Sequence, residues 1–464
     1  MTTVKHSSKS RDHTEGLPVG PLYDLETQPV PRFELSAGEI SPDAAYQIIH
    51  DELMLDGSAS LNVATFVTTW MEPHAERLMA ECLDKNMIDK DEYPQTAAIE
   101  ARCVNILSNL WHAPESDEAT GCSTTGSSEA VMLGALALKR RWQKRRRADG
   151  MPADKPNIVM GANVQVCWEK FANYWEVEMR LVPMEGDRYH LSPEEAVKRC
   201  DENTIGVCAI LGSTFDGSYE PVADICAALD AFEEESGIDV PVHVDGASGG
   251  MFAPFVDPDL IWDFRLPRVA SINTSGHKYG LVYPGVGWIV WRDVESLPDE
   301  LIFRVNYLGD TMPTFALNFS RPGAQVVAQY YNFMRLGFEG YRRVQQYARD
   351  VATGLSARLD ELGPFDLLTR GDELPVFAMA LKPEIENYTV FDLSLALRER
   401  GWQVPAYTFP ENRTDLAALR VVVRRGFTHD MADLLLADVK RQLARLEKQP
   451  APTHDAADAT GFAH

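Results

Sequence analysis

The chain has 464 residues, of which 45% are apolar and 24% are charged, a composition typical of globular proteins that excludes a disordered chain, a collagen or a coiled coil. Acidic residues outnumber basic ones by 69 to 44, and the net charge of −25 disfavours nucleic acid and anionic membranes as partners. No apolar run approaches the roughly 18 residues of a membrane span, the polar N-terminus is not a secretory signal, and the 7 scattered cysteines form no C-x2-C pair. We therefore expect a cytoplasmic protein with free thiols and no metal site.

The N-terminal region is predicted to be a polar tail followed by one helix. Residues 1–20 are polar and basic, as is typical of a tail. Ser41 can cap the first free amides of a helix, Pro42 suits its first turn, and Gly57 ends it. We assign residues 1–60 to an N-terminal tail and helical segment, which either serves assembly or packs on its own subunit.

Strands and helices alternate from about residue 120 onward. Residues 205–211 form a continuous apolar run of strand length, which is typical of a strand buried on both faces of a sheet. Further strands are predicted at 157–160, 180–183, 240–244, 269–273 and 287–291, and helices from Gly126 toward Arg141, from Ser192 and at 221–236. The α/β alternation predicts a mostly parallel, doubly wound sheet within a large domain at 61–345, with ligands at the carboxyl ends of the strands.

The remaining residues are predicted to form a smaller α+β domain. A helix at 323–336 leads out of the large domain. Strands follow at 376–381 and 419–424, and helices at 389–400 and from Thr428 to about Lys448. These elements give a small C-terminal domain at 346–450 and a tail at 451–464. The basic run at 139–147 is interpreted as a solvated helix end, because cations are favoured near a helix C-terminus.

Three short motifs carry functional groups that pyridoxal phosphate chemistry requires. The SGHK motif ends in Lys278, whose amine can form a Schiff base with the cofactor aldehyde. The VHVDGA motif places Asp245 at a strand end, where a carboxylate can hold the pyridine nitrogen, and Ala247 leaves room for the flat ring. The GSS motif places Ser127 and Ser128 at a helix N-terminus that can bind the phosphate. Each motif alone is weak, but together on a parallel sheet they predict this cofactor.

These motifs belong to longer stretches that resemble the glutamate decarboxylases, within the fold-type I, group II family of pyridoxal-phosphate-dependent decarboxylases. The resemblance runs from about residue 30 to about residue 448 and rests on stretches such as DEYPQTAAIE, VQVCWEKFANYWEVE, IWDFRLPRVASINTSGHKYG and LRVVVRRGF. It implies a fold-type I enzyme that converts L-glutamate to 4-aminobutyrate and carbon dioxide, consumes a proton, and forms at least a homodimer, with a homohexamer as the larger alternative. A role in acid tolerance or in glutamate metabolism follows from the same resemblance.

The resemblance also implies a role for each residue of the cofactor site. Lys278 would be the Schiff-base lysine, and Asp245 would pair with the pyridinium nitrogen. Gln165 and Ala247 would enclose the ring, with Thr214 near the ring substituents. The phosphate would be held by Ser127, Ser128, Ser275 and His277, and Ser320 would reach a phosphate of the neighbouring subunit.

On the substrate side, the resemblance implies two carboxylate sites. The side-chain carboxylate would be held by Thr65, Phe66, Asn86 and Asp89, and the α-carboxylate by Arg420. Tyr307 would lie on a loop that closes over the site. Either Tyr307 or Lys278 could then protonate Cα, which would make Lys278, Tyr307 and His277 the catalytic set.

The C-terminal tail suggests regulation by pH. In some bacterial relatives a histidine near the C-terminus enters the site at neutral pH, and His464 is the equivalent candidate, with a disordered terminal residue as the other interpretation. The chain lacks the basic, tryptophan-containing extension of plant members, so calmodulin is not an expected partner. Two departures, Gly246 for alanine and Glu169 for a histidine of some bacterial relatives, cast little doubt on the activity.

Several other functions stay open at this level. A related decarboxylase could act on aspartate or an aromatic amino acid, but an aromatic substrate would not need the site at Thr65, Phe66, Asn86 and Asp89. Transamination and carbon–sulfur lysis use the same cofactor and fold. A binding protein that kept the fold is disfavoured because Lys278 and Asp245 are both present.

Overall fold

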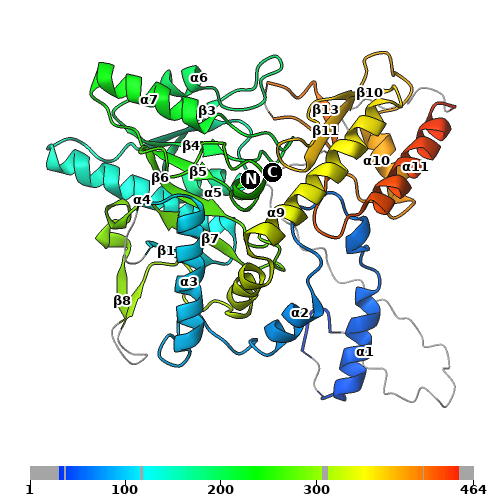
Figure 1. Cartoon of the computed structure of the whole chain (residues 1–464), viewed down its shortest axis with the longest axis horizontal. Coiled ribbons are helices and arrows are strands. Elements are labelled where there is room, and N and C mark those ends of the chain that lie inside the picture. Colours follow the sequence, from blue (N-terminus) through cyan, green and yellow to red (C-terminus); the bar gives the residue numbers. More distant parts are fainter. Residues whose placement is uncertain (1–30, 36–37, 115–118, 306–311, 411, 449–464) are drawn as a thin grey trace. The chain divides into compact units, whose positions relative to one another are not determined.

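The computed structural model describes residues 31–35, 38–114, 119–305, 312–410 and 412–448 (Figure 1). The chain divides into two compact units, Met1–Gly57 and Ser58–His464. The first unit contains α1 (Pro42–Leu53), which begins as predicted, because the Ser41 hydroxyl accepts a hydrogen bond from the amide of Ala44 and Pro42 occupies the first turn. No residue of α1 is buried.

The second unit is built around a seven-stranded sheet. The strands are β1 (Gly121–Thr124), β2 (Asn157–Gly161), β3 (Glu178–Val182), β4 (Thr204–Ile210), β5 (Val242–Asp245), β6 (Val269–Thr274) and β7 (Gly287–Trp291), in the spatial order β1-β7-β6-β5-β4-β2-β3. Strands β2 to β6 pair in parallel, and β7 runs antiparallel to both β6 and β1. The predicted mostly parallel α/β sheet is therefore confirmed, with two antiparallel pairings at one edge.

Helices cover both faces of this sheet, as the apolar run of β4 predicts. Successive β4 side chains point to opposite faces. Val207 belongs to one hydrophobic core with Ile225 of α7, and Cys208 belongs to another with Trp168 of α5 and Leu138 of α4. The α-helices of this layer are α2 (Pro73–Ala80), α3 (Pro94–Leu110), α4 (Ser127–Ala148), α5 (Val166–Tyr174), α6 (Pro193–Val197), α7 (Val222–Ser236) and α8 (Ala253–Val256). The short 3-10 helices are Ala59–Leu61, Gly249–Met251, Val294–Ser296 and Asp299–Leu301.

A second, antiparallel sheet follows in the C-terminal part of the chain. Its strands are β10 (Phe365–Leu367), β11 (Val376–Leu381), β12 (Ala406–Thr408) and β13 (Ala417–Val422), in the order β10-β11-β13-β12. Helices α10 (Val390–Arg398) and α11 (His429–Leu446) share a hydrophobic core with it. This is the predicted small α+β arrangement, while its boundary at residue 346 stays a prediction.

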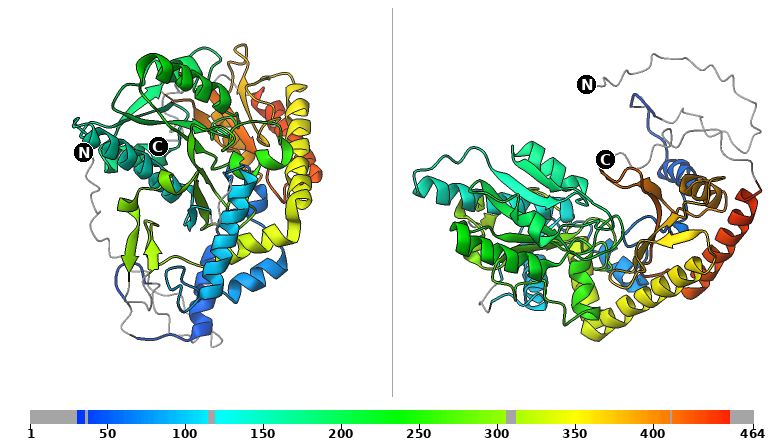
Figure 2. Two further views of the ribbon diagram at one scale, coloured as in Figure 1. Left: turned by 60° about the vertical axis from the view of Figure 1, so that its left-hand side comes forward. Right: turned by 90° about the horizontal axis from the view of Figure 1, so that it is seen from above.

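Helix α9 (Ala324–Asp360) connects the two sheets (Figure 2). It is longer than the predicted helix at 323–336, because the chain turns at Gly337, with φ of 56°, and then resumes the helix. The left-handed conformation explains why the prediction stops there, since only glycine adopts it without strain. Strands β8 (Phe303–Val305) and β9 (Met312–Thr314) form a separate two-stranded sheet.

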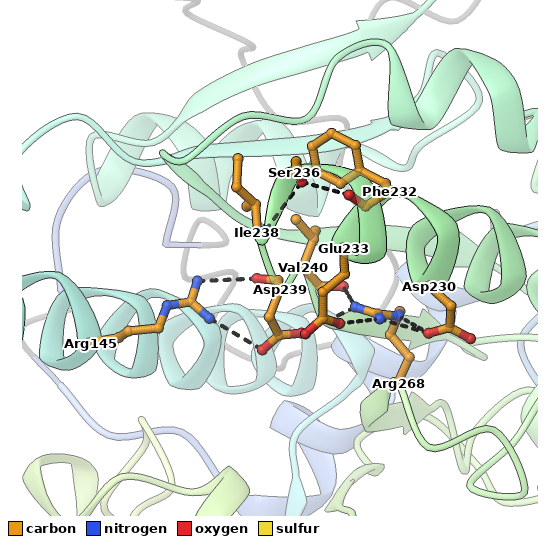
Figure 3. Close-up of polar contacts among 9 residues, drawn as sticks. All are labelled: Arg145, Asp230, Phe232, Glu233, Ser236, Ile238, Asp239, Val240 and Arg268. Atoms are coloured by element: carbon orange, nitrogen blue, oxygen red, sulfur yellow. Dashed lines mark hydrogen bonds and ion pairs between the residues drawn. The ribbon is translucent and has the colours of Figure 1, made fainter.

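Ion pairs hold the amino-terminal edge of the large sheet together (Figure 3). Arg268, just before β6, donates to Asp230 at 2.7 Å and Glu233 at 2.6 Å on α7, and to Asp239 at 3.1 Å ahead of β5. Arg145, in the last turn of α4, lies 3.2 Å from the same Asp239. This edge lies opposite the carboxyl ends at which a ligand is predicted. In the part of the chain that the structure describes, no helix is long and apolar enough to cross a membrane.

Candidate active site

A cavity of about 580 Å³ opens at the carboxyl ends of β4, β5 and β6, as the fold predicts. Loops after these strands and the N-terminus of α4 form its walls. The predicted residues that line it are Thr65, Phe66, Ser127, Ser128, Gln165, Thr214, Asp245, Ala247, Ser275, His277 and Lys278. Thr65 and Lys278, which are 213 positions apart in sequence, thus line the same cavity.

Lys278 projects from the turn that follows β6. Its Nζ lies 3.2 Å from the Ser248 hydroxyl and 5.1 Å from the centre of the Phe66 ring. Burial lowers the pKa of the Lys278 amine, while the negative charge of Asp245 acts in the opposite direction. A lowered pKa increases the fraction of neutral amine, which is the form that attacks a carbonyl carbon.

Three N–H donors fix the Asp245 carboxylate at the end of β5. Trp168 Nε1 donates to Oδ2 at 2.8 Å, while Asn273 Nδ2 and the Ala247 amide donate to Oδ1 at 3.0 and 3.1 Å. The residue is 5% exposed. The carboxylate is therefore held in one orientation at the cavity wall.

A buried relay of hydrogen bonds, from Ser271 through His243 to Asn273, ends at this carboxylate. The Asn273 amide also donates to the Ser127 hydroxyl at 3.2 Å, and its oxygen lies 2.8 Å from Nε2 of His243. Because an amide oxygen can only accept, Nε2 carries the proton and Nδ1 accepts from Ser271 at 2.7 Å. Burial lowers the pKa of His243, which keeps the ring neutral. Asn273 thus joins Asp245 to the N-terminus of α4.

The opposite end of the cavity suits an anion. Ser127 begins α4, a helix of 22 residues whose first amides have no partner within the helix, and its hydroxyl lies 2.7 Å from that of Ser275. Nδ1 of His277 is buried and has no hydrogen-bond partner among the described residues. Burial and the nearby Lys278 lower the pKa of His277 to about 4, so the ring is neutral. A Cβ at Gly126 would lie 3.0 Å from this ring, so the close approach favours glycine.

The lining as a whole fits pyridoxal phosphate. An unpartnered imidazole nitrogen, two serine hydroxyls and a helix N-terminus match a phosphate. A fixed carboxylate matches a ring nitrogen, and a lysine with a lowered pKa matches an aldehyde. Gln165 at the start of α5 and Ala247 after β5 both line the space between these groups.

Arg420 lies at the edge of the cavity rather than in its lining. The guanidinium of this β13 residue donates to the carbonyl oxygens of Thr214 and Ala64, two lining residues, and lies 5.0 Å from the Phe66 ring centre. The residue is 5% exposed, and in the described part of the chain its buried Nε has no hydrogen-bond partner. One donor thus stays available beside the cavity.

Besides Arg420, three further predicted substrate or cofactor residues lie outside the lining of this cavity, namely Asn86, Asp89 and Ser320. Asn86 Nδ2 donates to the Ser320 hydroxyl at 3.2 Å, and the Arg321 amide donates to Asn86 Oδ1 at 3.1 Å. Two segments that are distant in sequence thus meet at one exposed place. Tyr307 and His464 lie outside the described residues.

Sequence reasoning missed several residues of the site. Asn273, His243 and Trp168 were not assigned a role, although all three stand within recognised stretches. Cys167 and Asn163 also line the cavity. Burial raises the pKa of the Cys167 thiol to about 12, so it stays protonated. Only the position of Asn273 and His243 on neighbouring strands, near the Asp245 strand end, could have signalled their role.

Comparisons with known proteins agree with this site. Residues 37–382 match the pyridoxal-dependent decarboxylase conserved domain. The chain is 54% identical to a glutamate decarboxylase of Aliivibrio fischeri, over 94% of each chain, and 51% identical to one of Solanum lycopersicum, over 96% of this chain and 89% of the relative. Its structure is similar to a Lactobacillus brevis glutamate decarboxylase, with a TM-score of 0.89 and 47% identity over 92% of this chain and 97% of that one. A Burkholderia pseudomallei sphingosine-1-phosphate lyase, 20% identical over 91% of this chain and 95% of that one, shares the fold with a TM-score of 0.76.

Proposed function

Because the chain belongs to the glutamate decarboxylases, within the pyridoxal-dependent decarboxylase family, we propose that it converts L-glutamate to 4-aminobutyrate and carbon dioxide with consumption of one proton. The observation that carries this proposal is one cavity that unites Lys278, Asp245 and the N-terminus of α4. Thr65, Phe66 and Arg420 lie beside that machinery and supply groups for a substrate with two carboxylates.

Different residues of the cavity would hold different parts of the cofactor. Asp245 would hold the ring nitrogen, and Gln165 and Ala247 the two faces of the ring. Thr214 would face the ring substituents, and the phosphate would be bound by Ser127, Ser128, Ser275 and His277. When bound, pyridoxal phosphate supplies an electron sink for the electron pair released as the carboxyl group leaves.

Two sites would orient the substrate, one at Arg420 and one at Thr65 and Phe66. Arg420 would bind the α-carboxylate, because a guanidinium suits a carboxylate and no described residue accepts a hydrogen bond from its Nε. Thr65 and Phe66, which line the cavity next to Arg420, would face the side chain of glutamate. Carbon dioxide departs from Cα, and the proton that replaces it comes from Lys278 or Tyr307.

We propose further that Asn86, Asp89 and Ser320 act in the cavity of a second copy of the chain. The support is that Asn86 and Ser320 contact each other at an exposed place and do not line their own cavity. A chain with Lys278→Ala and a chain with both Asn86→Ala and Ser320→Ala would each be inactive alone. Mixed dimers would contain one intact site, so refolding an equal mixture should restore about a quarter of the wild-type activity. No recovery would contradict the shared site.

The activity itself is tested by spectroscopy and product analysis. The purified protein, loaded with pyridoxal phosphate, should show visible absorbance that Lys278→Ala abolishes, and should form 4-aminobutyrate from L-glutamate at pH about 5. L-aspartate and aromatic amino acids serve as competing substrates. Visible absorbance without 4-aminobutyrate would keep the cofactor and reject the substrate.

A role in acid tolerance and control by His464 are proposals that follow from the consumed proton and the reference pKa of histidine near 6.5. Deletion of residues 451–464 should extend activity toward neutral pH, and an unchanged pH profile would reject control by His464.

The exposed helix α1 supports a role in assembly beyond the dimer. Sedimentation of a variant without residues 1–57 tests that role, and the cytoplasmic location stays a prediction.

A further inference from the structure

The segment 59–72 carries Thr65 and Phe66 to the cavity without the support of a helix or a sheet. After the short 3-10 helix Ala59–Leu61 it belongs to no named strand or helix. An isolated bridge from Asn62 to Gln403 and single backbone hydrogen bonds, such as those from the Val422 amide to the Val63 carbonyl at 2.9 Å and from the Thr68 amide to the His277 carbonyl at 2.7 Å, tie it to the rest of the chain. Backbone groups in such a segment need partners from elsewhere, because unpaired buried peptide groups are costly. The position of Thr65 and Phe66 therefore depends on what binds this segment.

Arg424, just beyond β13, binds four groups of the segment with one side chain. Its Nε donates to the carbonyl of Thr65 at 3.1 Å and its Nη1 to the hydroxyl of Thr69 at 2.7 Å. Its Nη2 donates to the carbonyls of Ala59, at 3.1 Å, and Asn62. All four acceptors belong to the segment 59–72. The rigid fork of a guanidinium suits such a set, which an ammonium group could not satisfy.

The Arg424 guanidinium is committed to this segment alone. The residue is 7% exposed and forms no ion pair with any described carboxylate. Burial lowers its pKa, which reflects the penalty for a charge that only carbonyl and hydroxyl oxygens compensate. A cation in this situation is displaced if its acceptors move, so segment and arginine fix each other.

The segment in turn fixes the substrate side of the cavity. Asn62 Oδ1 accepts from the amides of Ala64 and Thr65 at 2.9 and 3.2 Å, so a carbonyl held by Arg424 and the turn before Thr65 belong to the same residue. The Phe66 ring then lies 5.1 Å from Lys278 Nζ and 5.0 Å from the Arg420 guanidinium. A shift of the segment would change both distances.

We propose that Arg424 is a positioning residue for substrate recognition, which holds the segment 59–72 so that Thr65 and Phe66 meet the substrate side chain. The proposal rests on the proposed function, in which these two residues face the side chain of glutamate. Arg424 contacts none of the residues that would hold the cofactor, which distinguishes its effect from a loss of cofactor binding.

The test uses the full-length, cofactor-loaded enzyme with Arg424→Met and Arg424→Lys. In Arg424→Met the KM for L-glutamate should rise about tenfold or more, with kcat changed less than about threefold and the visible absorbance of the cofactor unchanged. Arg424→Lys should recover part of the loss, because an ammonium reaches fewer of the four acceptors. If Arg424→Met fails to fold, Thr69→Val removes a single acceptor and should raise KM about twofold to threefold.

Arg292→Met is the matched control. The Arg292 side chain also donates to backbone carbonyls, those of Phe264, Leu266 and Val269, but just after β7, at the edge of the sheet opposite the cavity. Its loss should lower the melting temperature and leave KM unchanged. If Arg424→Met or Thr69→Val behaves in the same way, the role is structural and the inference is overturned.

Thr65→Ala separates this inference from the proposed function. A raised KM in Thr65→Ala together with an unchanged KM in Arg424→Met would overturn the inference alone. An unchanged KM in Thr65→Ala would reject the placement of the substrate side chain, whatever Arg424→Met shows. A raised KM in both variants, absent from Arg292→Met, is the result we expect.

Discussion

Asn273 links the two ends of the cofactor site through one side-chain amide. Its two N–H groups donate to Asp245 and to Ser127, and its oxygen accepts from His243. The Asp245 carboxylate fixes which way the amide points, because a reversed amide would place its oxygen against a carboxylate oxygen. The carboxylate that we propose for the ring nitrogen and the serine that we propose for the phosphate are therefore positioned together.

Removal of this amide should weaken cofactor binding. In Asn273→Ala, Asp245 loses a donor while staying buried, and hydrogen bonds to charged groups contribute about 1.5–3 kcal/mol each. The dissociation constant for pyridoxal phosphate should rise about tenfold to a hundredfold, as measured by titration of the apoenzyme. Ser271→Ala removes only the far end of the relay and should change the constant about threefold or less. An unchanged constant in Asn273→Ala would show that the relay does not act on the cofactor.

Gly134 offers a second test of the same relay. Alanine in place of a helical glycine usually stabilises a protein by about 1 kcal/mol. A Cβ at Gly134 of α4 would lie 2.6 Å from Cε1 and 2.8 Å from Nδ1 of His243, which the Ser271 and Asn273 bonds hold in place. Gly134→Ala should therefore lower the free energy of unfolding by about 1–3 kcal/mol, as overpacking does. Gly354→Ala in α9, with open space at that position, should stabilise the protein, and equal effects in urea denaturation would contradict the clash.

At the scale of elements, the Arg268 cluster joins α7, β5 and β6 far from the chemistry. The Arg268 side chain is 8% exposed, whereas the side chains of Asp230, Glu233 and Asp239 are 62%, 44% and 50% exposed. Solvent screens the carboxylates, so each pair contributes modestly, but the three share one buried cation. Without it they would repel one another.

Arg268→Met should lower the free energy of unfolding by about 2 kcal/mol and leave the KM for L-glutamate unchanged. The expected value lies below that of a fully buried ion pair because the three carboxylates stay hydrated. Arg145→Met removes only an exposed pair with Asp239 and should change stability by about 0.5 kcal/mol or less. Urea denaturation of the two variants measures the difference, and an equal small effect would show that Arg268 is not the centre of the cluster.

The elements that could be predicted from sequence are those with local signals. The central parallel strands are predictable because they are apolar runs buried on both faces, such as β2 and β4, whereas the edge strand β3 is only partly buried. Strand β1 was missed, because its four residues, GCST, carry no strand pattern and are specified by antiparallel pairing with the distant β7. The same contrast between local and tertiary signals decides which site residues can be predicted from sequence. Lys278, Asp245 and Ser127 stand in short motifs, whereas the contacts of Asn273 and Arg424 with the residues they support arise only from tertiary structure.

At the scale of the whole molecule, the buried carboxyl groups and the net charge of −25 both act against stability as pH rises. Glu220, next to the first turn of α7, is 2% exposed and accepts from the amides of Leu191 at 2.8 Å and Ile210 at 2.6 Å. Burial is the main cause that raises its pKa to about 7, with Asp245 acting in the same direction and the two amides and Asn163 opposing it. A protein with this balance is more stable in mild acid.

The sign of this effect follows from proton binding. The unfolded chain loses the Glu220 proton near its ordinary pKa of 4.5, whereas the folded chain keeps it to about 7. Between these values the folded state binds more protons, so the free energy of unfolding falls as pH rises, by up to roughly 3 kcal/mol from this group. The melting temperature should therefore be higher at pH 5 than at pH 7.5. Glu220→Gln cannot titrate and should flatten this slope, although it loses an acceptor for one of the two amides.

Glu195→Gln is the control for that slope. Hydrogen bonds from Lys198 and Arg199 lower the pKa of Glu195 from its ordinary value of 4.5 to about 2. Because both values lie below pH 5, Glu195 is mainly ionised from pH 5 to pH 7.5 in the folded and in the unfolded state. Its replacement should leave the slope unchanged. An equal slope in the wild type and Glu220→Gln would show that general charge repulsion, rather than one buried carboxyl group, makes the enzyme more stable in acid.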